Sequence, residues 1–83
     1  MECMDCIEPT TALVDTRGSH CPVPVIELSR AIEEIQVGDV VEILSDDPSS
    51  RVDIPVWCRM KRHEFVGVRD IDEAQSYVVR RAV

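Results

Sequence analysis

The chain has 83 residues, of which 45% are hydrophobic and 30% are charged, and its formal net charge is −7 at pH 7. This length suits one domain with a modest core, and the apolar share is too high for intrinsic disorder. No apolar run approaches the roughly 18 residues that span a bilayer, and the acidic balance disfavours nonspecific binding to nucleic acid or an anionic membrane. The acidic start of the chain also lacks the pattern of a secretory signal, so we expect a cytoplasmic protein.

The charge is distributed unevenly. Residues 1–50 carry eleven acids and two bases, whereas residues 51–83 carry seven bases and five acids. The second part contains a basic cluster formed by Arg59, Lys61 and Arg62. Such a cluster can dock an acidic partner or a tRNA, although a solvated helix face without a partner is the more common role.

The chain begins with a lead-in over residues 1–10, which we expect to be flexible, and a single domain follows over residues 11–83. The first strand is expected at residues 11–16, where β-branched residues such as Val14 and Thr16 favour extended backbone.

The stretch Asp15–Pro24 reads Asp-Thr-Arg-Gly-Ser-His-Cys-Pro-Val-Pro, with a turn at Gly18. Proline is tolerated in the first turn of a helix, so Pro22 suits the first helical position and Pro24 falls in the same turn. This spacing predicts that Cys21 is the N-cap residue, where the helix dipole favours a negative charge. A thiol placed there loses its proton readily, and the thiolate is the reactive form.

The alternative for Cys21 is a buried and inert side chain, which is the commoner role of a lone cysteine. An inert core cysteine gains nothing from two prolines that rigidify the turn after it. We therefore interpret Cys21 as a reactive thiol.

The first helix is expected from about residue 22 to residue 36. Its apolar residues recur at helical spacing, and Gly38 is typical of a position just past a helix end. A largely apolar strand follows at residues 40–44.

The second helix is expected within residues 50–62, where Pro55 restricts its start. Proline inside a helix costs about 3 kcal/mol or more, so the sequence favours Asp53 as the N-cap and Pro55 in the first turn. The buried side of this helix is expected to consist of Val56, Trp57 and Met60.

Two strands end the chain, at about residues 64–69 and 75–81. The link between them lacks glycine, so a tight two-residue turn is not predicted. The order β-α-β-α-β-β predicts an α/β (α+β) fold: a two-layer sandwich with two helices on one face of a four-stranded mixed sheet.

Three further cysteines have no clear chemistry in the sequence. Cys3 and Cys6 form a C-x-x-C pair, but zinc normally needs four ligands and no second pair completes the set. We therefore expect no metal site and no cofactor, and a cytosolic compartment argues against structural disulfides.

Two sequence blocks resemble a known family. The first, Gly18-x-x-Cys21-Pro22-Val23-Pro24, is similar to the C-P-x-P signature of the TusA/SirA family of small sulfur carriers. The second block consists of Gly38, Val41-Glu42-Ile43, Asp46-Asp47-Pro48 and Asp53-Ile54-Pro55. Together they extend the resemblance over roughly residues 11–81.

The resemblance implies that Cys21 accepts sulfane sulfur as a persulfide from a cysteine desulfurase or a rhodanese. It implies that the sulfur then passes to an acceptor protein, in tRNA thiolation, molybdenum cofactor biosynthesis or oxidative sulfur metabolism. Asp15 and Gly18 match family positions that shape the approach to the cysteine, and a monomer that forms transient complexes is expected.

Some positions depart from the family pattern or have an open role. Ser19 stands where relatives commonly carry leucine. His20 is either an accessory group that favours the thiolate or a surface residue. Cys58 is either a resolving thiol or, as we favour, a buried residue beside Trp57.

Two other functions stay open at this point. A regulatory or protein-binding module would use the basic cluster and would not need Cys21. A thiol redox sensor would pair Cys21 with another cysteine.

Overall fold

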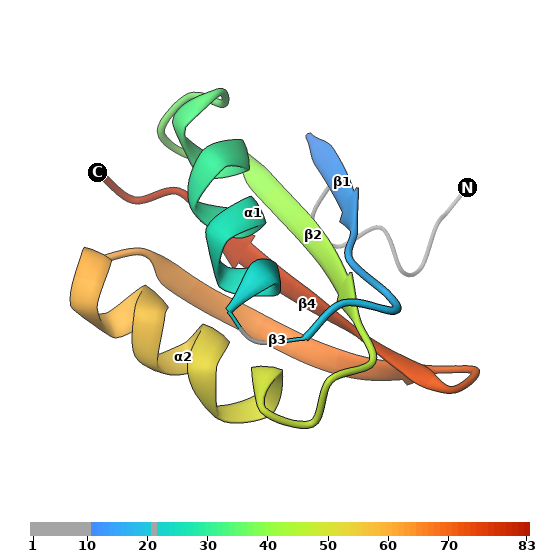
Figure 1. Ribbon diagram of the computed structural model, residues 1–83. Coiled ribbons are helices and arrows are strands. Elements are labelled where there is room, and N and C mark those ends of the chain that lie inside the picture. The colour runs from blue at the N-terminus through green and yellow to red at the C-terminus, as the bar shows by residue number, and fades with distance from the viewer. Residues whose placement is uncertain (1–10, 21) are drawn as a thin grey trace.

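Six elements form in the predicted order in the computed structural model, which describes residues 11–20 and 22–83 (Figure 1). Residues 1–10, with Cys3 and Cys6, and Cys21 lie outside the described residues. The elements are β1 (Ala12–Asp15), α1 (Val23–Glu33), β2 (Val40–Ser45), α2 (Ser50–Lys61), β3 (Glu64–Ile71) and β4 (Ala74–Arg80).

The four strands form one sheet in the order β1-β2-β4-β3. Strands β1 and β2 are parallel and are joined through α1, whereas β4 runs antiparallel to both β2 and β3. Both helices cover the same face of this sheet (Figure 1). The predicted two-layer sandwich with a mixed sheet is therefore confirmed.

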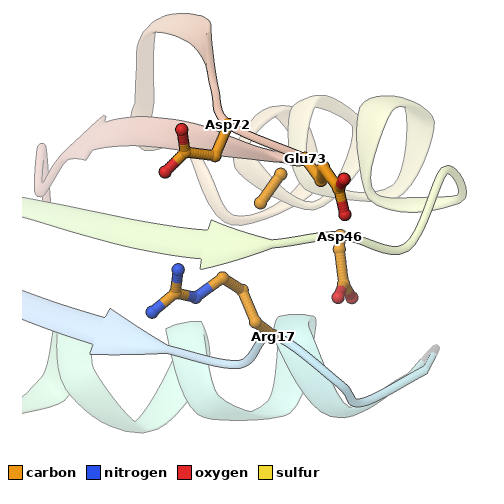
Figure 2. A pocket seen from close by; sticks show the side chains of 5 residues that line it. Arg17, Asp46, Asp72 and Glu73 are labelled. Atoms are coloured by element: carbon orange, nitrogen blue, oxygen red, sulfur yellow. The ribbon is translucent and has the colours of Figure 1, made fainter.

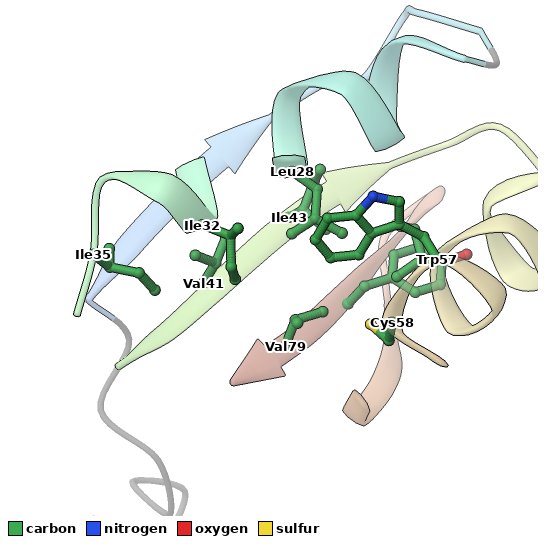
Figure 3. Close-up of a cluster of buried hydrophobic side chains, with 10 residues drawn as sticks. Leu28, Ile32, Ile35, Val41, Ile43, Trp57, Cys58 and Val79 are labelled. Carbon is green, nitrogen blue, oxygen red and sulfur yellow. The ribbon is translucent and has the colours of Figure 1, made fainter. Parts of the chain in front are cut away.

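The core lies between the helices and the sheet (Figure 3). Its apolar side chains come from α1 and the residues after it, β2, α2 and β4, namely Leu28, Ile32, Ile35, Val41, Ile43, Ile54, Trp57, Cys58, Tyr77 and Val79. On α1 the buried residues recur at the predicted helical spacing.

Helix α1 ends earlier than predicted. Its last residue is Glu33, and the guanidinium of Arg81 donates hydrogen bonds to the carbonyl oxygens of Ile32 and Ile35. These bonds satisfy acceptors that a longer helix would have paired internally. Gly38, at φ +96°, belongs to the turn before β2 and does not close the helix.

Helix α2 begins earlier than predicted, with Ser49 as its N-cap, so the prediction of Asp53 as the N-cap is wrong. The helix starts with tight turns. The N–H of Ser50 donates to the carbonyl of Asp47 at 3.0 Å, and the N–H groups of the next two residues also donate to carbonyls three positions earlier. Pro55 therefore lies inside the helix. Its cost of about 3 kcal/mol is offset by burial of the helix face, since each fully buried large apolar side chain contributes about 1.5–3 kcal/mol.

The buried face of α2 also differs from the prediction. It consists of Ile54, Trp57 and Cys58 together with the N-terminal Ser50. Val56 and Met60, which were expected in the core, are 44% and 69% exposed. Trp57 alone of the expected three is buried, because the sheet contacts the side of the helix that carries Ile54 and Cys58.

Strands β3 and β4 are joined by a two-residue turn, Asp72 and Glu73, contrary to the prediction of a longer link. Asp72 adopts a φ of +45°. Aspartate is one of the few residues that tolerate this conformation, so the turn forms without glycine.

Neither helix in the described part of the chain is both long enough and apolar enough to cross a membrane.

Candidate functional site

The turn between β1 and α1 carries the predicted site. Cys21 itself lies outside the described residues, so the geometry comes from residues 16–20 before it and from Pro22 onward after it. Helix α1 starts at the end of the sheet at which β1 and β2 finish (Figure 1).

Thr16 anchors the first part of this turn to β2. Its backbone N–H and its Oγ1 both donate to the carbonyl oxygen of Leu44, at 2.8 and 2.6 Å. The Thr16 side chain is buried, and its own carbonyl accepts the N–H of Ser19 at 3.0 Å. The chain therefore leaves the sheet in a direction that β2 fixes.

Gly18 and Asp46 form a second connection between the turn and the end of β2. The N–H of Gly18 donates to Oδ1 and Oδ2 of Asp46, each at 3.1 Å. Gly18 has a φ of +88°, and a Cβ atom built there would meet nothing within 4 Å. Glycine is therefore favoured by the backbone conformation and not by lack of space.

Asp15 and Arg17 form an ion pair at the start of the turn. The guanidinium of Arg17 donates Nε–H and Nη2–H bonds to the Asp15 carboxylate at 2.9 and 2.7 Å. These bonds lower the pKa of Asp15 to about 2 and raise the pKa of Arg17. Because both side chains are solvent-exposed, the pair orients the turn more than it stabilises the fold.

A polar recess of about 630 Å³ adjoins the turn, and Figure 2 shows Arg17, Asp46, Asp72 and Glu73 gathered around it. These side chains come from the turn, from the end of β2 and from the β3–β4 turn. The sequence placed Asp46 only within a turn. Its contact with Gly18 joins residues 28 positions apart, and the family block Asp46-Asp47-Pro48 was the signal that could have indicated it.

The start of α1 differs from the prediction by one residue. Pro22 is the N-cap, because its carbonyl oxygen accepts the N–H of Ile26 at 3.0 Å, and Pro24 is the second helical residue. The prediction that Cys21 is the N-cap is therefore wrong. The N–H of Val23 is already taken by the carbonyl of His20 at 2.9 Å, and prolines have no N–H. Val23 and the two prolines therefore offer no free N–H to a thiolate at this end of α1.

Cys58 lies in the core and is 1% exposed, so its predicted burial is confirmed. Desolvation raises the pKa of its thiol to about 11. A neutral, buried thiol is a poor nucleophile, which removes the structural basis for a resolving role. The side chain of His20 is exposed, and its accessory role stays a prediction.

The basic cluster lies at the end of α2. Arg59, Lys61 and Arg62 are exposed, and within the described residues none of the three forms an ion pair. No group of three potential metal ligands occurs in residues 11–20 and 22–83.

Sequence comparisons match this chain to one family of proteins. Residues 12–81 match the family model described as sulfurtransferase TusA. A candidate sulfur carrier protein of Archaeoglobus fulgidus is 42% identical over 69 residues, which cover 83% of this chain and 94% of that protein. The sulfur carrier protein TusA of Pseudomonas entomophila is 34% identical over 70 residues, which cover 84% of this chain and 88% of that protein.

The fold also occurs in a solved structure. The crystal structure of the SirA-like protein from Desulfitobacterium hafniense matches with a TM-score of 0.77, covering 87% of this chain and 99% of that one. At 23% sequence identity, this likeness concerns the fold alone.

Proposed function

This chain belongs to the TusA family of sulfur carriers, and from that membership we propose that Cys21 carries sulfane sulfur as a persulfide from a donor to an acceptor protein. The observation that carries the proposal concerns the cysteines within the matched residues 12–81. Only Cys21 and Cys58 fall in that range, and Cys58 is buried with a raised pKa. Cys21 is therefore the cysteine that remains for the exchange.

Loading is a thiol–persulfide exchange that needs no external oxidant. The Cys21 thiolate attacks the outer sulfur of the donor persulfide and forms a new S–S bond. The S–S bond of the donor breaks, and the donor cysteine leaves as a thiolate that takes a proton from water. The proton that Cys21 lost goes to solvent, so atoms and electrons balance without a cofactor.

Delivery repeats this exchange in the other direction. A thiolate of the acceptor attacks the outer sulfur of the Cys21 persulfide, and the Cys21 thiolate leaves. A lower pKa of Cys21 makes it a better leaving group, so one local environment assists both steps.

The described surroundings of Cys21 support these steps. The positive end of the α1 dipole favours the thiolate, and Pro22 and Pro24 restrict the backbone at that end. On the other side, Gly18 is held by Asp46, and the Asp15–Arg17 pair orients the start of the turn. We assign these residues support roles, and we keep His20 as an accessory group that would favour the thiolate when protonated.

The partners follow from this chemistry. The donor is a protein persulfide, for which a cysteine desulfurase or a rhodanese is the expected source. The acceptor belongs to a pathway such as tRNA thiolation, molybdenum cofactor biosynthesis or oxidative sulfur metabolism. We propose that the domain of residues 11–83 acts in the cytoplasm as a monomer, through transient complexes with these proteins.

The first test is the intact mass of the protein after incubation with a cysteine desulfurase and cysteine in the absence of reductant. Wild type and Cys58→Ala should each gain the mass of a sulfur atom, which thiol removes, and Cys21→Ser should not. An adduct that persists on Cys21→Ser would assign the sulfur to another cysteine. Absence of an adduct on wild type with both a desulfurase and a rhodanese would contradict the proposed function.

A further inference from the structure

His63 holds the part of the chain that follows β4. The backbone N–H of Ala82 donates to Nδ1 of His63 at 3.1 Å, and the two residues are 19 positions apart. A ring nitrogen that accepts a hydrogen bond carries no proton, so this bond fixes His63 as the neutral form with its proton on Nε2. The bond therefore exists only while the imidazole is neutral.

Trp57 fixes the plane of the same imidazole. The two rings stack with their centroids 5.4 Å apart and an angle of 27° between their planes. Trp57 is 8% exposed and belongs to the core, whereas His63 is half-buried at the start of the chain that leads from α2 to β3. The imidazole thus contacts the core on one side and the chain after β4 on another.

A recess of about 220 Å³ lies beside these rings, between the last turns of the two helices. Its lining includes Glu33, Trp57, Lys61, His63, Arg81 and Val83. Because Val83 borders the recess and Ala82 is bound to His63, residues 82–83 form part of its wall.

Arg81 is fixed independently of His63. Its backbone N–H donates to the carbonyl of Asp39 at 2.9 Å, and its guanidinium donates to the carbonyl of Ile32 at 3.1 Å. Nε of Arg81 also donates to the backbone oxygen of Val83 at 2.8 Å, an exposed contact between residues two positions apart. The bond from Ala82 to His63 is therefore the contact that ties residues 82–83 to the end of α2.

Charged groups surround the imidazole on each neighbouring element: Glu33 of α1, Lys61 of α2, Arg81 after β4, and Arg62 and Glu64 on either side of His63 in the chain. Burial, and after it the charge of Arg81, lowers the pKa of His63 from its ordinary value of 6.5. Glu33 and the face of the Trp57 ring favour a cation and act in the opposite direction. Since the pKa is lowered, burial and Arg81 outweigh them.

We propose that His63 is a pH-sensitive latch, in which protonation of Nδ1 breaks the bond from Ala82 and releases residues 82–83 from the recess. The proton comes from solvent, no covalent bond changes, and the step reverses when the pH rises. The protonated ring turns an N–H toward the N–H of Ala82, so two donors face each other and the segment moves away. The inference is independent of the proposed function, because neither Cys21 nor its turn takes part.

The direction of the pH dependence follows from the lowered pKa. The folded chain favours the neutral imidazole, so the contribution of the bond to stability is fully present above pH 6.5 and is lost as the pH falls through the folded value. The latch is therefore closed at neutral pH and opens in acid.

The test is an NMR titration of the full chain from about pH 8 to about pH 5, which follows the imidazole of His63 and the backbone amide of Ala82. The chain has two histidines and one tryptophan, so each signal can be assigned. His63 should titrate with a pKa below 6.5, and the Ala82 amide shift should follow with the same midpoint. The order parameter of this amide should fall from about 0.85 to below about 0.6 across the transition.

Two substitutions should remove the transition in opposite ways. His63→Asn offers an oxygen that can accept the Ala82 N–H and does not titrate, so Ala82 should stay ordered at both ends of the pH range. His63→Phe keeps a ring on Trp57 but offers no acceptor, so Ala82 should be mobile throughout. His20→Gln is the control, because His20 is exposed and lies in the turn before α1, and it should keep the wild-type transition.

Trp57 fluorescence provides a second readout, because an imidazolium in contact with an indole quenches its emission. The emission of wild type should fall with the midpoint of the His63 titration, and it should not change with pH in His63→Phe. An Ala82 amide that stays ordered while His63 titrates would overturn the latch, and so would a His63 pKa at or above 6.5. Both of these results come from wild type alone, so the test does not depend on the folding of the variants. A transition that persists at Ala82 in His63→Phe would assign it to another group and would also overturn the proposal.

Discussion

The backbone N–H of Gly18 donates to both carboxylate oxygens of Asp46, each at 3.1 Å, across 28 positions of sequence. This bond connects the turn that leads to Cys21 with the end of β2. Asp46 follows directly after β2, so the bond fixes the turn from the sheet.

Replacing Asp46 should test this role. We expect Asp46→Ala to lower the free energy of unfolding by only about 0.5–1.5 kcal/mol, the usual net value of one hydrogen bond, and to slow loading of Cys21 by polysulfide. Asp46→Asn keeps an acceptor oxygen and should restore most of the rate. Glu73→Ala, in the same recess but without a bond to the turn, serves as the control. Equal loading rates for Asp46→Ala and wild type would contradict a positioning role.

Gly18 and Gly38 lie in different turns but have similar backbone conformations, so Gly38 can serve as a control for Gly18. Both have positive φ, +88° and +96°, and a Cβ atom at either would meet nothing within 4 Å. Each glycine-to-alanine change should therefore destabilise the fold by a similar amount, about 1–2 kcal/mol, measured by urea unfolding. Only Gly18→Ala should also slow sulfur loading, because Gly38 lies in the turn before β2. A loading defect of the same size in Gly38→Ala would attribute the effect to general destabilisation.

Cys58 should contribute to stability and not to sulfur transfer. Cys58→Ala removes one buried atom and should cost about 1 kcal/mol of unfolding free energy, while sulfur loading stays at the wild-type rate. The measurement is chemical unfolding combined with the intact-mass assay. A large loss of loading in a folded Cys58→Ala protein would restore the resolving-thiol hypothesis.

The raised pKa of Cys58 also predicts a pH dependence of stability. Its folded-state value of about 11 lies above the value of the unfolded chain. The stabilising contribution of the neutral thiol is therefore fully present below about pH 8.5, the ordinary thiol pKa, and is lost as the pH rises through the folded value. As the pH rises from about 8.5 through the folded pKa, the free energy of unfolding of wild type should fall relative to that of Cys58→Ala. A difference between the two proteins that does not change with pH would contradict this assignment.

We expect Pro55 to lower the stability of the folded protein relative to alanine at the same position. Pro55→Ala restores a backbone N–H inside α2. It also removes a ring of the kind that crowds the preceding turn of a helix. We expect Tm to rise, with a gain of about 1 kcal/mol or more after the larger entropy of the unfolded alanine chain is subtracted. Pro48→Ala, in the turn before the helix, should have the opposite sign. A lower Tm for Pro55→Ala would show that packing of the ring outweighs the missing hydrogen bond.

Much of the site could be predicted from the sequence, because the residues that indicate it lie close together in the chain. The prolines at positions 22 and 24 identified the start of a helix, and Gly18 identified the turn before it. The placement failed by one residue, because Pro22 is the N-cap of α1 and its carbonyl oxygen accepts the N–H of Ile26. The contact between Gly18 and Asp46 was not predicted, since no periodicity connects one turn with another turn 28 positions away.

The element order, the mixed sheet and the apolar stripe of α1 were determined by sequence, because hydrophobic spacing reports which side of an element can be buried. Which side is buried depends on the neighbouring elements, and only the tertiary structure decided it for α2. There the sheet covers Ile54 and Cys58, while Val56 and Met60 are left at the surface. The same packing offsets the cost of Pro55 inside the helix. An apolar recess between the two helices, lined by Pro22, Val25, Val56 and Met60 among others, therefore exists only in the folded chain, because it needs both helices to be packed on one sheet.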